Sequence, residues 1–368
     1  MIREQAENIN RSIKEKVLQD VAAIFPVQGR NQRIELESIR IDEAREPDVT
    51  NFDTMLKAKH DNGTVAVPVK VALTLTDAAG KRVDRGEFTL IRVPLMTATG
   101  AFVVNGTDYY IPTQLRLKAG VYHRQKPDNT FESRFNLERG LNFRVVYDPV
   151  SYRMRIVMSG KTMDFINFLR GIGVTDAEMI NTYGVDLFKR LSEAATGTPE
   201  KEVAKFFDIV HYGEAGDIDR AQWVRNYLAG TLMDSAVNNL TLGKPVDRAT
   251  PDALLESTKK LVEMAGGKGE EDLTSSIIYK KAFTPDDLLS EAYNKQVSLM
   301  KKTLQNRVDR FDKLTQIIPV SYMQKPIDQF FSKSSLSQAI ETENPTGMIN
   351  QLYKVTLTGE GGFGDDRA

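Results

Sequence analysis

The sequence predicts an α+β fold, in which a β-rich N-terminal part is followed by a helical middle and by a return segment near the C-terminus. Two observations indicate this order. Apolar and polar residues alternate over much of residues 33–158, which is typical of strands with one buried face. After Lys161 the apolar spacing becomes helical, with capping residues at the predicted helix starts. With 368 residues, 41% of them apolar, the chain is long enough for two or three domains.

A helix is predicted at the N-terminus. Apolar residues recur there near helical spacing, so one face of the helix should be buried: Ile9, Ile13, Val17, Val21 and Ile24. Pro26 should end this helix, because the residue before a proline is pushed out of the helical conformation.

Three hairpins are predicted in the β-rich part. The alternating stretch Val65–Leu75 is followed by the turn Asp77–Gly80, and Pro68 favours a position at the edge or the start of a strand. Asn105-Gly106 tolerates the positive φ angles of a type I′ turn. Asp148-Pro149 separates two further apolar stretches and predicts the third turn.

The helical middle shows several start signals. Thr175–Glu178 and Thr198–Glu202 have the pattern of capped helix starts. Thr284–Asp287 combines a threonine cap, a proline at the first helical position and acidic residues favoured by the helix dipole, and predicts a long helix to about Leu314. Residues 265–272 are glycine-rich and polar, which predicts a mobile loop.

The composition excludes several classes of site. The absence of cysteine excludes disulfides, thiolate zinc sites and a cysteine nucleophile. His60, His123 and His211 lack metal-ligand spacing. A net charge of −1 lacks the basic balance of an autonomous DNA-binding domain, so any nucleic-acid contact must be local. The apolar runs are far shorter than the roughly 20 residues of a membrane-spanning helix, and we expect a soluble intracellular protein with no membrane partner.

Glycines near the C-terminus formally match a nucleotide-binding motif. Gly359–Gly364 fit G-x-G-x-x-G and follow the strand-like residues Lys354–Thr358. A dinucleotide site needs a helix whose N-terminal amides face a pyrophosphate, and only Asp365–Ala368 follow the motif. An independent nucleotide-binding enzyme would require a cofactor to bind the isolated chain, whereas a flexible hairpin loop is the simpler interpretation.

Other patterns also have a simple structural interpretation. Asp217-Ile-Asp219 and Asp365-Asp366 are isolated, whereas polymerase-type metal chemistry needs clustered carboxylates. Trp223 and Phe206-Phe207 could form a stacking platform for bases, but aromatic residues more often fill cores. A local basic cluster could either meet phosphates or simply solvate the chain: Arg116, Lys118, Arg124 and Lys126.

Two segments resemble the β subunit of bacterial DNA-directed RNA polymerase. Residues Ile91–Leu115 (IRVPLMTATGAFVVNGTDYYIPTQL) are similar to a β-subunit run almost position for position. Residues Ser334–Ala368 (SSLSQAIETENPTGMINQLYKVTLTGEGGFGDDRA) resemble a second run that follows in the same order. The resemblance covers most of the chain and is specific in Leu95–Val121 and Lys325–Ala368.

The resemblance implies a β-rich protrusion domain with a discontinuous return segment, and a mostly helical lobe domain. It assigns residues 1–120 plus about 305–340 to the protrusion, 121–304 to the lobe and 341–368 to the start of the fork. The fork includes a glycine-rich loop formed by Gly359, Gly361, Gly362 and Gly364.

The resemblance also implies an N-terminal β-like subunit that forms the cleft wall and the RNA–DNA hybrid channel for template-directed nucleotidyl transfer. In the family the metal-binding aspartates lie in β′. We therefore expect no catalytic or metal-binding residue here, Mg²⁺ only in the assembled complex, and no activity of the isolated chain.

Several residues fall on family positions that line the hybrid channel. Their hydrogen-bonding and cationic side chains would track phosphates and sugars without reading sequence. They are Gln114, Ser335, Gln338, Glu341, Asn344, Lys354 and Arg367. Without the resemblance, Gln338 and Glu341 are better interpreted as exposed positions of a helix over residues 326–340.

The expected partners follow from the same resemblance. Multi-subunit polymerases of giant bacteriophages divide β and β′ among separate polypeptides, and this chain resembles such a piece. The expected partners are a β C-terminal-like chain, β′-like chains, the DNA template and the RNA transcript, with a promoter-specificity subunit left open. The expected location is the cytoplasm of an infected bacterial host, with packaging in the virion as an alternative. A second hypothesis is a non-catalytic β-derived protein that binds and regulates a host RNA polymerase.

The chain departs from the family at positions that form the rifamycin pocket of bacterial enzymes. An H-K-R-R run of the family corresponds to Gln351–Lys354, a family serine to Thr356 and a family arginine to Tyr109. We hypothesise that a polymerase containing this chain is rifamycin-resistant.

Overall fold

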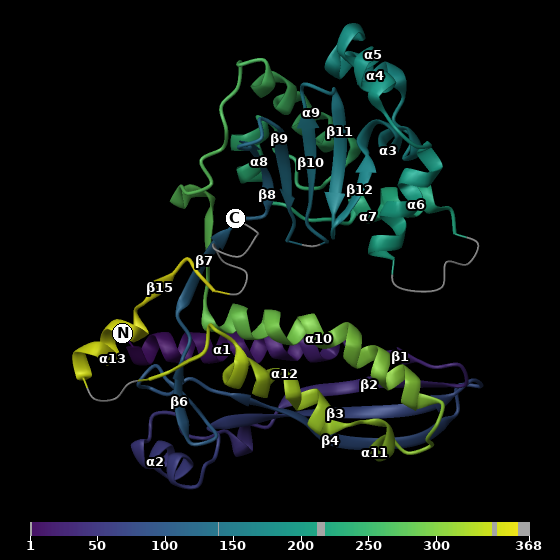
Figure 1. Ribbon diagram of the computed structural model, residues 1–368. Coiled ribbons are helices and arrows are strands. Elements are labelled where there is room, and N and C mark those ends of the chain that lie inside the picture. The colour runs from purple at the N-terminus through teal and green to yellow at the C-terminus, as the bar shows by residue number, and fades with distance from the viewer. Residues whose placement is uncertain (1, 139, 212–217, 341–343, 360–368) are drawn as a thin grey trace. The chain divides into compact units, whose positions relative to one another are not determined.

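The computed structural model describes residues 2–138, 140–211, 218–340 and 344–359. Helices and strands are mixed, which confirms the predicted α+β class (Figure 1). The chain forms two compact units, of which the first comprises Met1–Arg116 and Ala282–Ala368 and the second Leu117–Lys281. The chain enters the second unit through β7 (Thr113–Leu117) and leaves it through β13 (Lys280–Phe283).

The first unit combines helices with small sheets. Its remaining strands are β1 (Val27–Gln28), β2 (Gln32–Ile41), β3 (Ala66–Asp77), β4 (Arg82–Pro94), β5 (Phe102–Val104), β6 (Thr107–Tyr110), β14 (Gln338–Ala339) and β15 (Val355–Thr356). Its helices are α1 (Ile2–Ala22), the 3-10 helix η1 (Glu43–Arg45), α2 (Phe52–His60), α10 (Pro285–Val308), α11 (Leu314–Ile317), α12 (Val320–Lys333) and α13 (Pro345–Leu352). The largest sheet is antiparallel, in the order β1-β2-β3-β4.

The predicted hairpins are present. The Asp77 carboxylate accepts hydrogen bonds from the backbone N–H groups of Ala79 and Lys81 at the β3–β4 turn. Pro68 lies near the start of β3, just before the pairing with β2 begins at Val69. Between β5 and β6, Asn105 and Gly106 have φ angles of 49° and 78°, as a type I′ turn requires.

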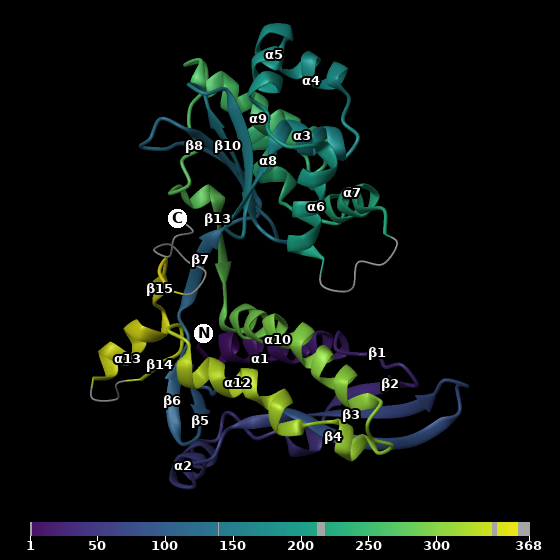
Figure 2. The same cartoon turned by 45° about the vertical axis from the view of Figure 1, so that its right-hand side comes forward.

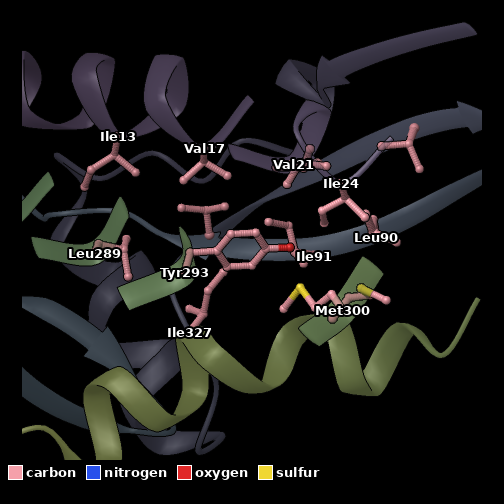
Figure 3. Packing of buried hydrophobic residues seen from close by; sticks show 14 of the residues in the cluster. Ile13, Val17, Val21, Ile24, Leu90, Ile91, Leu289, Tyr293, Met300 and Ile327 are labelled. Carbon is pink, nitrogen blue, oxygen red and sulfur yellow. The ribbon is translucent and has the colours of Figure 1, made fainter. Parts of the chain in front are cut away.

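A large apolar core holds most of the first unit together (Figure 3), and Met55, Val65 and Val103 form a smaller cluster. The predicted stripe of α1 packs against α10, and α12 packs against α10 and β4. Figures 1 and 2 both show these three helices along one side of the β1–β4 sheet. Tyr293 of α10 points between Val17 of α1 and Ile327 of α12 (Figure 3), and each of the three is at most 1% exposed. Burying an apolar side chain such as that of Val17 or Ile327 stabilises the fold by about 1.5–3 kcal/mol.

The structural boundary of the second unit differs from the predicted lobe boundary at residue 304. α10 belongs to the first unit, because its apolar stripe is buried against α1 and Lys16 of α1 lies 2.5 Å from both Asp286 and Asp287. α10 also ends at Val308, before the predicted Leu314. There the Asp309 carboxylate accepts hydrogen bonds from the backbone of residues 30 and 31 at 2.7 and 2.9 Å.

The second unit packs an antiparallel sheet against helices. Its sheet has the order β12-β11-β10-β9-β8, with β8 (Gly120–Gln125), β9 (Phe131–Asn136), β10 (Phe143–Asp148), β11 (Arg153–Met158) and β12 (Lys161–Asp164). Its helices are α3 (Phe165–Gly171), α4 (Asp176–Tyr183), α5 (Val185–Ala194), α6 (Pro199–Val210), α7 (Arg220–Ala229), α8 (Ser235–Leu242), α9 (Pro251–Ala265) and the 3-10 helix η2 (Ile277–Tyr279). The helices α3, α6 and α9 lie on one side of the sheet (Figure 2).

The aromatic residues of the helical middle fill this core, as the simpler interpretation predicted. Phe206 and Phe207 are at most 1% exposed. Trp223 is partly buried, with its ring centroid 5.0 Å from that of Phe207 in an edge-on contact. The Phe206-Phe207 pair is therefore not available to stack on bases.

Part of the predicted mobile loop is anchored in the second unit. Asp272 is 8% exposed at its side chain and lies 2.8 Å from both Nδ1 of His123 and Nζ of Lys260. Burial lowers the pKa of His123, and the hydrogen bond to Asp272 opposes this shift. Burial also tends to raise the pKa of Asp272, but the hydrogen bonds and charges of His123 and Lys260 outweigh it and lower that pKa.

The buried His123–Asp272 pair should make the second unit acid-sensitive. The folded state resists protonation of His123, whereas the unfolded chain binds that proton below about pH 6.5. Stability is therefore lost as the pH falls from about 6.5 toward the pKa of the folded state. We expect His123→Gln, which keeps a hydrogen-bonding side chain but does not titrate, to flatten the fall in melting temperature between about pH 7 and pH 5.

Thermal unfolding followed by circular dichroism checks this. His60→Gln is the matched control, because the His60 side chain is 90% exposed and its loss should leave the pH profile of the wild type. Equal pH slopes for His123→Gln and the wild type would contradict the expectation.

Candidate nucleic-acid interface

Strand pairing joins the two segments that carry the family resemblance. β14 pairs antiparallel with β6, so that Gln338 lies opposite Tyr110. β15 pairs in parallel with β7, so that Thr356 lies opposite Gln114. We call β6, β7, β14 and β15 the strand junction. Gln338 and Tyr110 are 228 positions apart in the sequence, so strand pairing brings together two distant segments of the chain.

Gln114 is the central residue of the junction. Its side chain is 0% exposed, and its Nε2 donates a hydrogen bond of 3.0 Å to the carbonyl oxygen of Thr358. Its Oε1 accepts a hydrogen bond of 2.6 Å from Nε of Arg116. Both ends of the amide are thus satisfied, as burial requires. The structure makes Gln114 a positioning residue that ties the end of β15 to β7.

Arg116 fixes Gln114 in turn. Its guanidinium is an ion-pair partner of Glu291 on α10 and lies 4.8 Å from the ring centroid of Phe283. The Arg116 side chain is only 11% exposed, so its charge is compensated within the first unit. Sequence reasoning placed Arg116 in a local basic cluster that would either meet phosphates or solvate the chain. It missed the pairing with Glu291, which is 175 positions away.

Gly359 lies beside Gln114, just after β15. Its φ of +107° is one that residues with a side chain rarely adopt. A Cβ atom there would lie 2.8 Å from Cδ2 of Leu336 and 3.4 Å from Nε2 of Gln114. Glycine is therefore required where the chain passes Gln114. The other predicted loop glycines lie outside the described residues: Gly361, Gly362 and Gly364.

Ser335 and Gln338 lie on the exposed side of the junction. Ser335 occupies a turn after α12, and Gln338 belongs to β14 and accepts a hydrogen bond from the hydroxyl of Tyr110. The alternative that Gln338 lies on a helix over residues 326–340 is wrong, because α12 ends at Lys333 and the chain then pairs as a strand with β6.

Asn344 and Lys354 flank α13. Asn344 is exposed, and its Oδ1 accepts a hydrogen bond of 3.0 Å from the backbone N–H of Thr346. Lys354 is exposed and directly precedes β15. Glu341 and Arg367 lie outside the described residues. Of the seven predicted channel residues, the structure thus brings five to the strand junction or its flanks.

Acidic and basic groups elsewhere have local structural partners. Asp219 accepts hydrogen bonds from the first backbone N–H groups of α7, while Asp217, Asp365 and Asp366 are outside the described residues. In the part of the chain that the structure describes, no group of three or more His, Asp or Glu residues is arranged to hold a metal ion. No described helix has the length and apolarity to span a membrane.

The basic cluster predicted from the sequence is divided by the fold. Arg116 belongs to the first unit, and the other three residues belong to the second. Arg124 pairs with Glu132 at 2.6 Å and Lys126 pairs with Asp128 at 3.1 Å. Arg116, Arg124 and Lys126 thus each have an ion-pair partner within their own unit.

Comparison with known proteins finds β subunits of DNA-directed RNA polymerase among the relatives of this chain. The DNA-directed RNA polymerase subunit beta of Gloeobacter violaceus is 20% identical over 390 residues, which cover 100% of this chain and 35% of that protein. The subunit of the same name from Syntrophomonas wolfei subsp. wolfei is 23% identical and matches 85% of this chain and 30% of that protein. The subunit of the same name from Synechocystis sp. is 20% identical and matches 100% of this chain and 35% of that protein. No family model matches.

These similarities show homology to a portion of the β subunit at low identity. The chain spans about a third of the length of the curated relatives it matches, since 30–35% of each relative is covered.

Gln114→Leu should loosen the strand junction. It keeps the size of the side chain but leaves the Thr358 carbonyl and Nε of Arg116 without their hydrogen bonds to Gln114, at a cost of about 1–3 kcal/mol. We expect amide hydrogen exchange in residues 353–359 to accelerate about tenfold or more. Mass spectrometry of exchanged peptides measures this. Gln305→Leu, at an exposed position of α10, should leave the exchange of this segment unchanged. Slow exchange in both variants would rule out a clamping role for Gln114.

Proposed function

We propose that this chain is a β-like subunit of a multi-subunit DNA-directed RNA polymerase, in which it forms part of the cleft wall and of the RNA–DNA hybrid channel. One observation carries the proposal. The two segments that resemble the β subunit pair with each other through β14 and β15, and β-subunit relatives align along 85–100% of the chain.

The chemistry of the strand junction fits a moving nucleic-acid hybrid. Gln338, Asn344 and Lys354 present an amide, a second amide and an ammonium group at exposed positions, and Ser335 adds a hydroxyl. Such groups bind phosphates and sugars without reading bases. A wall with few charges also holds a polyanion only weakly, which suits a duplex that must advance by one base pair in each cycle.

We assign the catalytic Mg²⁺ to partner chains. Mg²⁺ is held by clustered carboxylates in polymerase-type sites, whereas the exposed groups at the junction and its flanks are amides, a hydroxyl and one ammonium group. The junction strands hold one carboxylate, that of Asp108, and it is paired with Lys59. The junction residues therefore do not fit this ion. In this proposal β′-like chains supply the metal site, and the isolated chain is inactive.

A partner polypeptide is proposed to cover the outer side of β15. Tyr353, Val355 and Leu357 alternate along this segment and are 42%, 54% and 47% exposed. Three apolar side chains in alternation beside a short strand favour contact with another chain. We assign this contact to a β C-terminal-like chain. The resemblance to split phage subunits further supports a bacteriophage origin and action in the cytoplasm of the infected host.

Purification of the tagged chain from cells that express its natural neighbours tests the proposal. We expect copurification with polypeptides that carry the rest of β and a β′-like D-x-D-x-D motif, and template-dependent incorporation of nucleotides by the complex but not by the isolated chain. Mass spectrometry identifies the partners, and a transcription assay measures the activity. Copurification with a complete host polymerase, together with a change in its activity, would instead support the β-derived regulator.

Rifamycin provides a test of the altered pocket positions. Tyr109 places an aromatic ring against Phe331, with centroids 6.1 Å apart, and Gln351, Lys354 and Thr356 replace family residues. We expect transcription by the assembled complex to continue at rifamycin concentrations that stop a bacterial polymerase in a parallel reaction. Inhibition of both enzymes in the micromolar range would refute the rifamycin hypothesis.

A further inference from the structure

The sheet of the second unit carries arginines on the face that is turned away from α3, α6 and α9. Four neighbouring strands, β8 to β11, contribute at least one arginine each. We call these residues the arginine face: Arg124, Arg134, Arg144, Arg153 and Arg155.

Strand register places these side chains on one face. Arg124 lies opposite Glu132, and Arg134 lies opposite Arg144. The alternate residues of β9, Phe131 and Phe135, are buried in the core with the helices. Because successive side chains of a strand point to opposite faces, the arginines point away from that core. In β11, Arg153 and Arg155 alternate in the same way with the buried residues Met154 and Ile156.

Three members of the arginine face are weakly compensated among the described residues, because Arg144 lies 3.9 Å from Glu132 and Arg153 and Arg155 form no ion pair there. Glu132 is 0% exposed and serves three arginines, with N–O distances of 2.6 Å to Arg124, 2.8 Å to Arg134 and 3.9 Å to Arg144. Arg134 and Arg144 are also direct cross-strand neighbours, and like charges in that position are destabilising. The fold thus tolerates an unfavourable pairing at the centre of this face.

Two other carboxylates on this face accept hydrogen bonds from backbone N–H groups. Asp148 accepts hydrogen bonds from backbone N–H groups of the β10–β11 turn, and Asp164 accepts one from Asn167 at the start of α3. The cations remain partly accessible: the side chains of Arg124, Arg134 and Arg144 are 37%, 21% and 42% exposed. Arg153 and Arg155 are exposed as well.

We propose that the arginine face binds the phosphodiester backbone of a nucleic acid. Adjacent strands are about 4.8 Å apart, so the face offers a row of guanidinium groups to a chain of phosphates. Guanidinium groups bind phosphate oxygens through paired hydrogen bonds. The apolar residues of the face do not favour a membrane or stacked bases, because Tyr122 and Val146 are buried and Val157 is half-buried. Binding should therefore be independent of sequence.

The choice of a nucleic acid over an acidic peptide rests on the proposed polymerase function. The arginine face is nevertheless a separate site. It belongs to the second unit, whereas the strand junction lies in the first, and it acts through charge rather than through neutral hydrogen-bonding groups.

Fluorescence anisotropy with the full chain tests the inference. The probe is a labelled single-stranded DNA of mixed sequence and about 20 nucleotides, which exceeds the site size of one binding domain. We expect binding that weakens between about 50 and 200 mM salt. Arg144→Glu/Arg155→Glu should weaken binding about tenfold or more and reduce the salt dependence, whereas Arg144→Lys/Arg155→Lys should retain most of the affinity.

The matched control is Lys189→Glu/Lys201→Glu, which makes the same change in net charge at exposed positions of α5 and α6. We expect it to bind nearly as tightly as the wild type. An equal loss of DNA affinity in both charge-reversal variants would show an effect of net charge alone and would overturn the inference. Unchanged DNA affinity in both variants would also overturn it. Circular dichroism checks folding, and Arg144→Gln/Arg155→Gln replaces the reversal variant if that one unfolds.

A competition experiment separates the two kinds of polyanion. Polyglutamate that displaces the DNA at equal charge concentration would show an acidic-peptide surface and contradict the choice of a nucleic acid. Failure of the chain to copurify with polymerase subunits would overturn the proposed function and leave an arginine-dependent DNA affinity standing. Copurification with polymerase subunits without an arginine-dependent DNA affinity would overturn only this inference.

Discussion

The buried amide of Gln114 is the interaction on which the candidate site depends. It lies where two segments far apart in the sequence meet, and it is hydrogen-bonded at both ends, to the Thr358 carbonyl and to Arg116. A buried amide without partners would cost several kcal/mol on transfer from water, so the site is stable only when β7, Arg116 and the end of β15 are all in place. Because β15 follows α13 directly, this clamp also limits where Asn344 and Lys354 can lie.

The two nucleic-acid surfaces proposed for the two units differ in chemistry. The strand junction presents exposed amides, a hydroxyl and one ammonium group on a buried hydrogen-bonded framework. The arginine face presents a row of partly exposed guanidinium groups. Neutral groups permit a bound duplex to move, whereas clustered arginines hold phosphates more strongly and more salt-dependently. We propose that the strand junction guides the moving duplex and that the arginine face holds the phosphates of a bound nucleic acid.

Local signals in the sequence were sufficient for much of the fold. Asn105-Gly106 predicts its hairpin because the turn itself needs positive φ angles, and Thr175 and Glu178 predict their helix start because a capping box is complete within four residues. Features that depend on distant partners could not be predicted in this way. Gln338 was given a helical alternative because its strand partner lies 228 positions away, and α10 was assigned to the lobe because only its packing on α1 places it in the first unit. The arginine face depends on the register of four strands and could not be recognised from composition.

The central claim is that the strand junction lies along the RNA–DNA hybrid of a polymerase. Site-specific photocrosslinking tests it most directly, with a photoreactive amino acid in place of Gln338 in the assembled complex, stalled on a scaffold with labelled RNA and template DNA. The account predicts crosslinks from position 338 to the RNA or the template strand, and none from a photoreactive residue at the exposed position 189 of α5. A complex that remains active and stalled but gives no crosslink to nucleic acid from position 338 would contradict it.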